Sequence, residues 1–328
     1  MRLFLTFVLA AALGLGCGTY AWVNGPLVLA AASVDLSIDP GSNPREVALQ
    51  VRQAGVAVNP ALLYWWFRLS GQARQIKAGS YELERGTSPA SLLSKLVRGE
   101  EALRSVTLVE GWNLRQFREA LKKADQLQPL TALLNAEELM QQVGKPGMAA
   151  EGRFFPDTYT YAKGTSDLAL LQRAARAMDK KLEAAWALRS AQSPLQSPEQ
   201  ALILASIVEK ETGRASDRAF IAAVFSNRLR IGMRLQTDPT VIYGLGPLFD
   251  GNLRRADLLA DTAFNTYTRT GLPPTPIAMP GRGALLVAVQ PADSKALYFV
   301  ARGDGTSQFS ASLDEHNRAV NKYQRGRP

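Results

Sequence analysis

The sequence predicts a mixed α+β protein that begins with a membrane-spanning helix and continues into a folded body. Three observations support this. Residues 3–23 contain no charged side chain, 46% of the 328 residues are hydrophobic and 20% are charged, and a strand–turn–helix pattern occurs three times after the apolar segment. Such a composition is typical of chains that fold around a core. The length suits one large domain or two smaller ones.

The apolar segment is long enough to cross a bilayer. As a helix rising about 1.5 Å per residue, residues 3–23 would span about 31 Å, the thickness of the hydrocarbon core. Tyr20 and Trp22 lie near the distal end, where aromatic side chains favour the interface. Arg2 on the short side favours a cytoplasmic N-terminus and an exported body. We therefore expect residues 1–28 to form a transmembrane anchor.

Two alternatives stay open for this segment. A cleavable signal peptide could end at Ala30-Ala31-Ala32, which fits an A-x-A-like cleavage site. A lipoprotein could be modified at Cys17, although Gly14, Leu15 and Gly16 precede it where a Leu-rich box is expected.

The chain has one cysteine and one histidine, which excludes several kinds of site. An internal disulfide, a cysteine-based zinc site, an iron–sulfur cluster and a poly-histidine metal site are all impossible. A catalytic triad would have to use His316, which follows Asp314-Glu315 near the C-terminus, and the sequence has no G-x-S-x-G motif. We expect His316 to be solvated, and we expect neither a cofactor nor a metal.

A glycine turn followed by a capped helix recurs in residues 41–47, 86–92 and 111–117. Each has Gly, one further residue, then Asn or Ser as a helix N-cap. Asn43 with Glu46 and Asn113 with Gln116 form capping boxes. Each cap follows a strand-like stretch, namely residues 34–38, 79–83 and 105–109.

The remaining segments predict mainly helices. Residues 59–69 form a helix whose aromatic side chains are expected in the core, with stacking on sugars as the alternative. Residues 124–152 resemble a polar linking segment with weak caps, and residues 166–189 form a long helix. The chain beyond residue 197 is expected to be one block of helices and loops rich in Gly and Pro.

One helix carries the best candidate for an acid. It opens with a capping box at Ser197 to Gln200 and stops at Gly213. Glu211 continues the apolar stripe of Leu204 and Val208. Partial burial and the C-terminal end of the helix dipole both raise the pKa of such a carboxyl group, as a general acid requires. Glu209 points about 200° away, so only one of the two can face a given cleft, and the alternative is a solvated helix end.

Several longer motifs closely resemble the MltG (YceG-like) family of membrane-anchored endolytic murein transglycosylases. They occur from residue 108 almost to the C-terminus: LVEG at 108–111, FPDTY at 155–159, ASIVEKET at 205–212, VFSNRL at 224–229, MRLQTDPTVIYG at 233–244, FNTYT at 264–268, GLPP at 271–274, PIA at 276–278, PG at 280–281 and LYFV at 297–300.

The resemblance implies a single-pass protein of the bacterial inner membrane with a periplasmic body. A LysM-like subdomain (residues 33–104) would precede a mainly helical, lysozyme-like catalytic domain (residues 105–328). The family cleaves the β-1,4 bond between N-acetylmuramic acid and N-acetylglucosamine in nascent glycan strands, leaving 1,6-anhydro ends. Its catalytic glutamate, the one in Lys-Glu-Thr, falls on Glu211. Expected partners are glycan strands, membrane lipid and, from the family alone, peptidoglycan synthases.

Two polar clusters are candidates for substrate binding, with ordinary turns as the alternative. They comprise Gln236, Thr237, Asp238 and Tyr243, and then Asn265, Thr266 and Tyr267. The net charge of +9 points to a polyanionic neighbour, and an exported body makes nucleic acid an unsuitable one. The basic residues Arg228, Arg230 and Arg234 would face phospholipid, the peptide carboxylates of peptidoglycan, or solvent.

Two other functions are compatible with the sequence. A non-catalytic peptidoglycan-binding scaffold would hold glycan on its repeated α+β units and leave Glu211 idle. A hydrolytic muramidase would pair Glu211 with Asp238 or Glu110, because hydrolytic glycosidases generally need two carboxyl groups. A lytic transglycosylase can instead use one acid twice.

Overall fold

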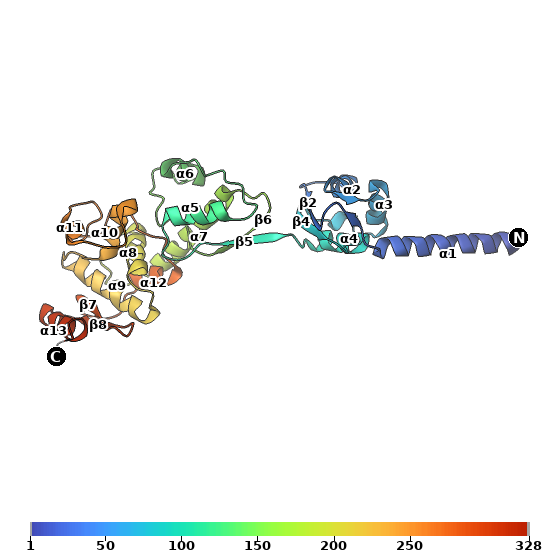
Figure 1. Cartoon of the computed structure of the whole chain (residues 1–328). Helices are drawn as coiled ribbons and strands as arrows, with labels where there is room; N and C mark the ends of the chain where they lie inside the picture. Colours follow the sequence, from blue (N-terminus) through green and yellow to red (C-terminus); the bar gives the residue numbers. More distant parts are fainter. Residues whose placement is uncertain (1, 327–328) are drawn as a thin grey trace. The chain divides into compact units, whose positions relative to one another are not determined.

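The computed structural model describes residues 2–326, which fold into two compact units (Figure 1). The first unit extends to Arg104 and includes Thr160–Gly164, and the second comprises Ser105–Tyr159 and the chain from Thr165 onward. Strands β5 (Leu103–Thr107) and β6 (Thr158–Ala162) form a two-stranded sheet and carry the chain from one unit to the other.

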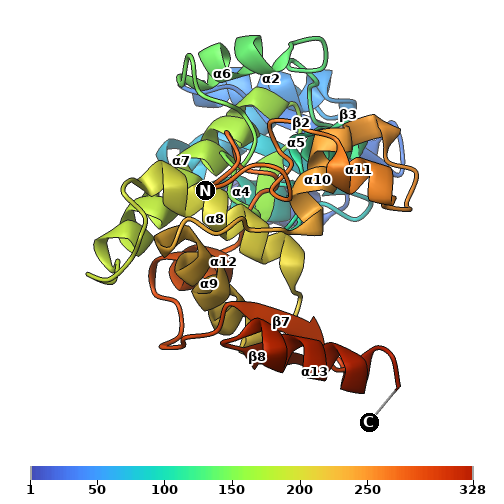
Figure 2. The same cartoon turned by 90° about the vertical axis from the view of Figure 1, so that its left-hand side faces the viewer.

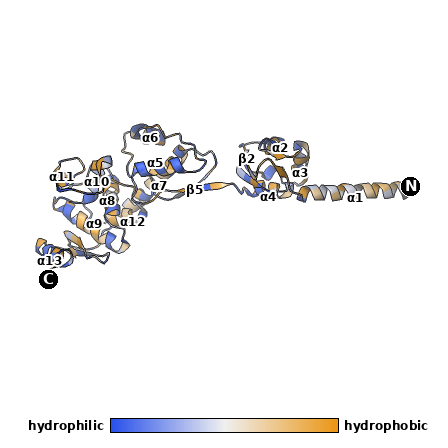
Figure 3. Cartoon of the chain, in the orientation of Figure 1, coloured by the Kyte–Doolittle hydropathy of each residue, from blue (hydrophilic) through white to orange (hydrophobic). Residues whose placement is uncertain are grey.

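The N-terminal helix α1 (Arg2–Asn24) confirms the helical prediction for the apolar segment. Within the described residues, Thr6–Asn24 is the one stretch long and apolar enough to cross a membrane by length and composition. Figure 3 shows it mostly white to orange on the hydropathy scale. Its last turn belongs to the first unit, because Val23 is buried and Trp22 packs against that unit's core.

The first unit is an α+β assembly around a two-stranded antiparallel sheet. In β2, Val34, Leu36 and Ile38 face the core in alternation, and Val34 pairs with Leu83 of β4. The elements are β1 (Val28–Leu29), β2 (Ser33–Ile38), α2 (Pro44–Gln53), β3 (Val56–Ala57), α3 (Pro60–Leu69), the 3₁₀ turn η1 (Ala73–Gln75), β4 (Gly79–Glu84) and α4 (Pro89–Arg98).

The predicted N-caps start their helices. Asn43 accepts hydrogen bonds from the backbone of Arg45 and Glu46, and the Glu46 side chain completes the capping box. Asn113 and Gln116 do the same for α5 (Leu114–Lys123). Ser88 also forms a capping box, with Ser91, which the sequence pattern did not predict.

The aromatic helix α3 differs from the prediction. Phe67 is fully buried, but Trp65 is 55% exposed, so the expectation that these rings lie in the core is wrong for Trp65. The periodicity explains this, because Leu63 and Phe67 occupy the helix face that is buried in the core of the unit, and Trp65 lies on another face.

The second unit is mainly helical. Its core is the packing of α8 against α9 and α12, which Figure 2 shows together. The elements are α5, α6 (Ala136–Val143), α7 (Asp167–Ala187), α8 (Pro198–Glu211), α9 (Ala215–Arg230), α10 (Asp238–Leu245), the 3₁₀ turn η2 (Gly246–Leu248), α11 (Arg255–Leu259), α12 (Arg282–Val289), β7 (Tyr298–Ala301), β8 (Ser307–Ser310) and α13 (Leu313–Tyr323).

Three local features of this unit correct the sequence interpretation. Helix α6 has strong caps, a capping box at Asn135 and a left-handed Gly144, so the segment is not weakly capped. Ser197 does cap α8, but Gln200 accepts from the Gln196 backbone and not from Ser197, so no capping box forms. Strands β7 and β8 form an antiparallel hairpin where only helices and loops were expected.

Candidate active site

Glu211 is the last residue of α8. The helix is buried from Ala201 to Val208 and ends because Thr212 adopts an extended backbone, with φ of −146°. Glu211 therefore emerges from the core at the carboxyl end of a helix, and its side chain is partly exposed. The helix dipole disfavours a negative charge at this end.

The carboxyl group of Glu211 has one fixed oxygen. The Thr237 hydroxyl donates to Oε2 at 2.7 Å, and Oε1 has no hydrogen-bond partner within residues 2–326. Burial raises the pKa of Glu211, and the negative charge of Asp238 raises it further, while the Thr237 hydrogen bond and Arg228 oppose the shift. When the acid is protonated with Oε2 held in this way, Oε1 is the oxygen that can present the proton to a ligand.

A threonine cluster positions Thr237. The Thr237 backbone N–H donates to Thr266 Oγ1 at 3.1 Å, and Thr240 Oγ1 donates to the Thr237 carbonyl at 2.8 Å. The preceding Gln236 has a left-handed φ of 49° and donates from its backbone to the Thr266 carbonyl. A non-glycine residue in this region is strained, so the cluster holds the loop in a conformation that a free chain would rarely adopt.

Asp238 and Tyr267 lie beside this cluster. The Tyr267 hydroxyl donates to Asp238 Oδ1 at 2.6 Å, and burial is the main cause of the raised pKa of Tyr267. Asp238 and the Gln236 side chain are exposed, and Tyr267 is half-buried. These three side chains are therefore accessible to a ligand near Glu211.

Asn265 and Thr266 make hydrogen bonds inside the fold, and their role in substrate binding stays a prediction. Both are buried, at 1% and 3% exposed. The Asn265 amide donates to the carbonyls of Asp257, Leu258 and Ala260, which fixes the loop after α11. Thr266 is occupied by the threonine cluster. In this conformation they support the site and do not face a ligand.

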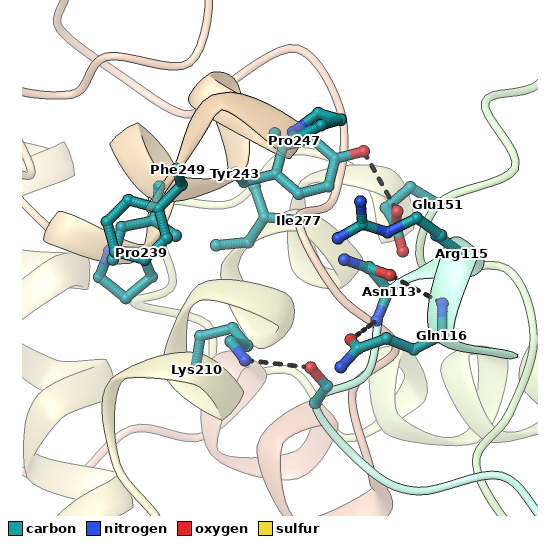
Figure 4. Close-up of a pocket in the computed structure, with 13 residues that line it drawn as sticks. Asn113, Arg115, Gln116, Glu151, Lys210, Pro239, Tyr243, Pro247, Phe249 and Ile277 are labelled. Carbon is teal, nitrogen blue, oxygen red and sulfur yellow. Dashed lines mark hydrogen bonds between the residues drawn. The ribbon is translucent and has the colours of Figure 1, made fainter. Parts of the chain in front are cut away.

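A pocket of about 590 Å³ lies next to this group, and Figure 4 shows its walls. Lys210, which precedes Glu211, and Pro239, which follows Asp238, both line it, whereas Glu211 itself is not among the lining residues. The lining residues come from five parts of the second unit: Gly111, Asn113, Arg115, Gln116, Glu151, Lys210, Pro239, Ile242, Tyr243, Gly246, Pro247, Phe249 and Ile277.

Glu151 is a buried acid in this pocket that the sequence analysis did not identify. It is 8% exposed and accepts hydrogen bonds from the Leu114 backbone at 3.0 Å and from the Tyr243 hydroxyl at 3.2 Å. Burial raises the pKa of Glu151 to about 7. The sequence around Glu151 carries no clear signal of a functional acid. Its hydrogen-bond partners, Leu114 and Tyr243, are too distant in sequence to predict.

Two other acids lie near the end of α8, Glu209 and Glu110. Glu209 is enclosed on the opposite face, where it accepts from the Gly281 backbone at 2.9 Å and lies 3.6 Å from the Arg218 guanidinium. Glu110, the rival candidate, lies against Gly281 and is exposed. Glu209 and Glu211 thus face different surroundings, as their separation around the helix predicts.

Two further expectations are wrong. Arg228 is buried, at 7% exposed, and donates to the carbonyls of Leu297, Arg234 and Leu235, so it holds loops and cannot face a membrane. His316 is half-buried and stacks on Tyr298 with ring centroids 5.1 Å apart, so it is not freely solvated. Burial lowers the pKa of His316.

A metal site would need several ligands in one place. Within residues 2–326, no three His, Cys, Asp or Glu side chains gather in that way. The expectation that the site uses neither metal nor cofactor stays a prediction.

The fold and the site define a mixed α+β protein with one apolar N-terminal helix and an acid at the end of a buried helix. Comparisons with known proteins give its family. A model of the YceG-like family matches residues 36–322, and the chain belongs to this family. A yceG-like protein from Listeria monocytogenes, known from a 2.6 Å crystal structure, is 29% identical with a TM-score of 0.54, covering 87% of this chain and 98% of that one.

Two curated relatives are both named endolytic murein transglycosylase. The endolytic murein transglycosylase of Bacillus subtilis (strain 168) is 30% identical over 310 residues, which is 89% of this chain and 85% of that protein. The protein of that name from Streptococcus pneumoniae serotype 2 (strain D39) is 28% identical over 323 residues. That match covers 88% of this chain and 58% of the streptococcal protein.

Proposed function

We propose that this protein is an endolytic murein transglycosylase that ends the elongation of peptidoglycan strands. It cleaves the β-1,4 bond between N-acetylmuramic acid and N-acetylglucosamine within nascent strands and leaves 1,6-anhydro ends. The observation that carries the proposal is the state of Glu211, an acid with a raised pKa, one oxygen fixed by Thr237 and the other free. The family and the name of the two relatives support the substrate class.

In this mechanism Glu211 acts first as an acid and then as a base. Protonated Oε1 donates to the glycosidic oxygen as the bond from that oxygen to C1 of the muramoyl residue breaks. The muramoyl C6 hydroxyl forms a new bond to C1, and the Glu211 carboxylate accepts the proton that this hydroxyl loses. The acid is regenerated and no water is consumed. Acid–base catalysis of this kind contributes roughly 10²–10⁴-fold.

A single acid is sufficient for this reaction. Hydrolytic glycosidases generally require a second carboxyl group, whereas here the substrate's 2-acetamido group can stabilise the positive charge that develops at C1. Asp238 accepts a hydrogen bond from Tyr267, and its charge helps Glu211 to keep its proton. This supports an electrostatic role for Asp238 beside a lone catalytic acid.

The candidate binding residues divide into two groups by exposure. Gln236, Asp238, Tyr243 and Tyr267 present exposed or half-buried polar atoms, and we assign them to contacts with sugar hydroxyls and acetamido groups. The buried group comprises Thr237, Asn265 and Thr266, and we assign it to positioning of the acid and its loop.

We further infer that α1 anchors the protein in a bacterial inner membrane with its N-terminus in the cytoplasm and its body in the periplasm. The length and composition of α1 and a wall polymer as substrate support this arrangement. Residues 33–104 would act as a LysM-like subdomain that holds glycan, and residues 105–328 would carry catalysis. Contact with peptidoglycan synthases is an expectation from the family.

The test is mass spectrometry of the products formed from purified peptidoglycan. We expect anhydro ends from the wild-type protein and almost none from Glu211→Gln. The circular dichroism spectrum of the variant should match that of the wild type, which would show that its fold is unchanged. Reducing ends would indicate a hydrolase, and intact strands a binding protein. Substantial anhydro product from the variant would overturn the role of Glu211.

A further inference from the structure

The pocket beside Glu211 carries two cations that the protein leaves without an ion-pair partner. Arg115 is exposed and has no hydrogen bond or ion pair within residues 2–326. Lys210 is exposed and donates only to the Gly111 carbonyl, at 3.2 Å. Figure 4 shows both side chains at the pocket together with Glu151.

The one carboxyl group in the pocket is occupied by other partners. Glu151 accepts from the Leu114 backbone and the Tyr243 hydroxyl. Burial raises its pKa to about 7, so a large fraction of it is uncharged at neutral pH. The pocket therefore keeps a net positive charge that is available to a ligand.

Part of the pocket lining is apolar. Ile242, Phe249 and Tyr243 line it together with two prolines. A volume of about 590 Å³ lies in the range of pockets that enclose small-molecule ligands. A pocket that combines cations with apolar side chains suits a ligand that combines carboxylates with short aliphatic side chains.

Two helices contribute residues both to the pocket and to the candidate active site. Lys210 precedes Glu211 on α8, and Pro239 follows Asp238 on α10. A ligand in the pocket would therefore contact the residues that adjoin Glu211 and Asp238 in the chain. In peptidoglycan, the group attached next to the scissile bond is the peptide stem of the muramoyl residue, which consists of short residues and several free carboxylates.

We propose that this pocket binds the carboxylate-bearing peptide stem, and that Arg115 and Lys210 bind the carboxylates of the stem. The inference rests on the proposed function. It means that the protein selects strands that still carry peptides and cleaves stripped strands less efficiently. A hydrogen bond to a charged group contributes about 1.5–3 kcal/mol, so each cation should account for roughly a 10- to 100-fold preference.

The experiment compares two substrates with the full chain in detergent. Uncrosslinked strands bearing tetrapeptides are compared with the same strands stripped by an amidase, and kcat/KM for anhydro-end formation is measured on each. We expect a preference for the peptide-bearing strands of at least about 100-fold, which falls about tenfold or more in Arg115→Gln and in Lys210→Gln. Lys123→Gln, an exposed cation on the same helix as Arg115 but outside the pocket, is the matched control and should keep the preference.

A binding measurement makes the outcome independent of turnover. Isothermal titration of free tetrapeptide into the full chain should show binding that Arg115→Gln weakens about tenfold or more. Equal preference in wild type and variants, with anhydro ends still formed, would overturn this inference and leave the proposed function intact. Absence of anhydro ends from the wild-type protein would overturn the proposed function, and the titration would then decide the pocket's ligand. Tighter binding of inorganic pyrophosphate than of tetrapeptide would also overturn the inference.

Discussion

Thr237 controls both the direction and the acidity of Glu211. Its hydroxyl stabilises the charged carboxylate and so lowers the Glu211 pKa against the effect of burial. In Thr237→Val this hydrogen bond is lost and the pKa rises. Because the first step needs the protonated acid, the alkaline limb of the kcat/KM profile should move to higher pH, while the maximum falls about tenfold from lost orientation.

The measurement is the pH profile of anhydro-end formation for wild type and variant. Thr270→Val, an exposed threonine on the same stretch of chain as Tyr267, is the control and should leave the profile in place. If the alkaline limb of Thr237→Val lay at the same pH as that of the wild type, the Thr237 hydroxyl would not affect the pKa of Glu211.

Glu151 makes the stability of the second unit depend on pH. Its pKa rises from 4.5 in the unfolded chain to about 7 in the fold, so the folded state binds more protons between these values. The stabilisation is complete below pH 4.5 and is lost as the pH rises through 7, by up to about 3 kcal/mol. The amide introduced by Glu151→Gln cannot ionise, so the stability of this variant relative to wild type should increase over this interval.

Urea-unfolding midpoints at several pH values from about 4.5 to 8.5 test this, since the interval brackets the titration of the folded acid. The difference between the two proteins isolates residue 151, because the other titrating groups are shared. A difference that stays constant with pH would contradict the assignment.

At the residue scale, the sequence singled out Glu211 as the candidate acid but did not predict its surroundings. Periodicity alone separated Glu211 from Glu209, because the helix that carries them is regular. The sequence did not predict the role of Glu151, because its hydrogen-bond partners Leu114 and Tyr243 lie 37 and 92 residues away in the chain. The burial of Glu151 depends on segments that are far apart in the chain, and no local pattern in the sequence predicts it.

At the scale of elements, the turn before β6 depends on a glycine for two reasons. Gly152 has φ of +80°, and an added Cβ would lie 2.5 Å from the Pro276 side chain. Gly147 has a similar φ of +76° but open space around it. Gly147→Ala should therefore cost roughly 1 kcal/mol of backbone strain, and Gly152→Ala roughly 3 kcal/mol because a steric clash is added.

Thermal unfolding of the two variants measures the difference directly. Gly152→Ala should also reduce activity more than Gly147→Ala, because it displaces the neighbouring Glu151. Equal losses of stability in the two variants would mean that Pro276 can move away from the added Cβ without lowering the free energy of unfolding.

Elements with a local code were predictable, and those without one were not. The caps at Asn43 and Asn113 followed from side chains that bond within their own turn. The β7–β8 hairpin was missed because its pairing joins strands across a Gly- and Asp-containing turn with little alternation to signal it. Exposure of Trp65 also depended on which face of α3 the rest of the unit covered.

At the scale of the whole molecule, we assign α1 two roles that a truncation can separate. Its exposed apolar length would hold the protein at a membrane, while Val23 in its last turn is buried in the first unit, as is Leu27 just beyond the helix. Deletion of residues 2–19 should release a folded protein into the soluble fraction. Deletion of residues 2–27 should release it too, but with a lower melting temperature because core contacts are removed.

Fractionation of cells and thermal melts of both truncations provide the readout. Retention of the shorter deletion in salt-washed membranes would show that another surface holds the protein there. Equal melting temperatures would show that the last turn of α1 does not contribute to the core.

The sequence by itself determined the apolar helix, the capped helices and the acid on the stripe of α8, because spacing of a few residues encodes each of them. Only the tertiary structure decided that Thr237 holds Glu211, that Asn265 and Arg228 are buried supports, and that Glu151 and two unpaired cations share a pocket. These features arise where distant segments meet, and the free energy of burial depends on all of the segments at once.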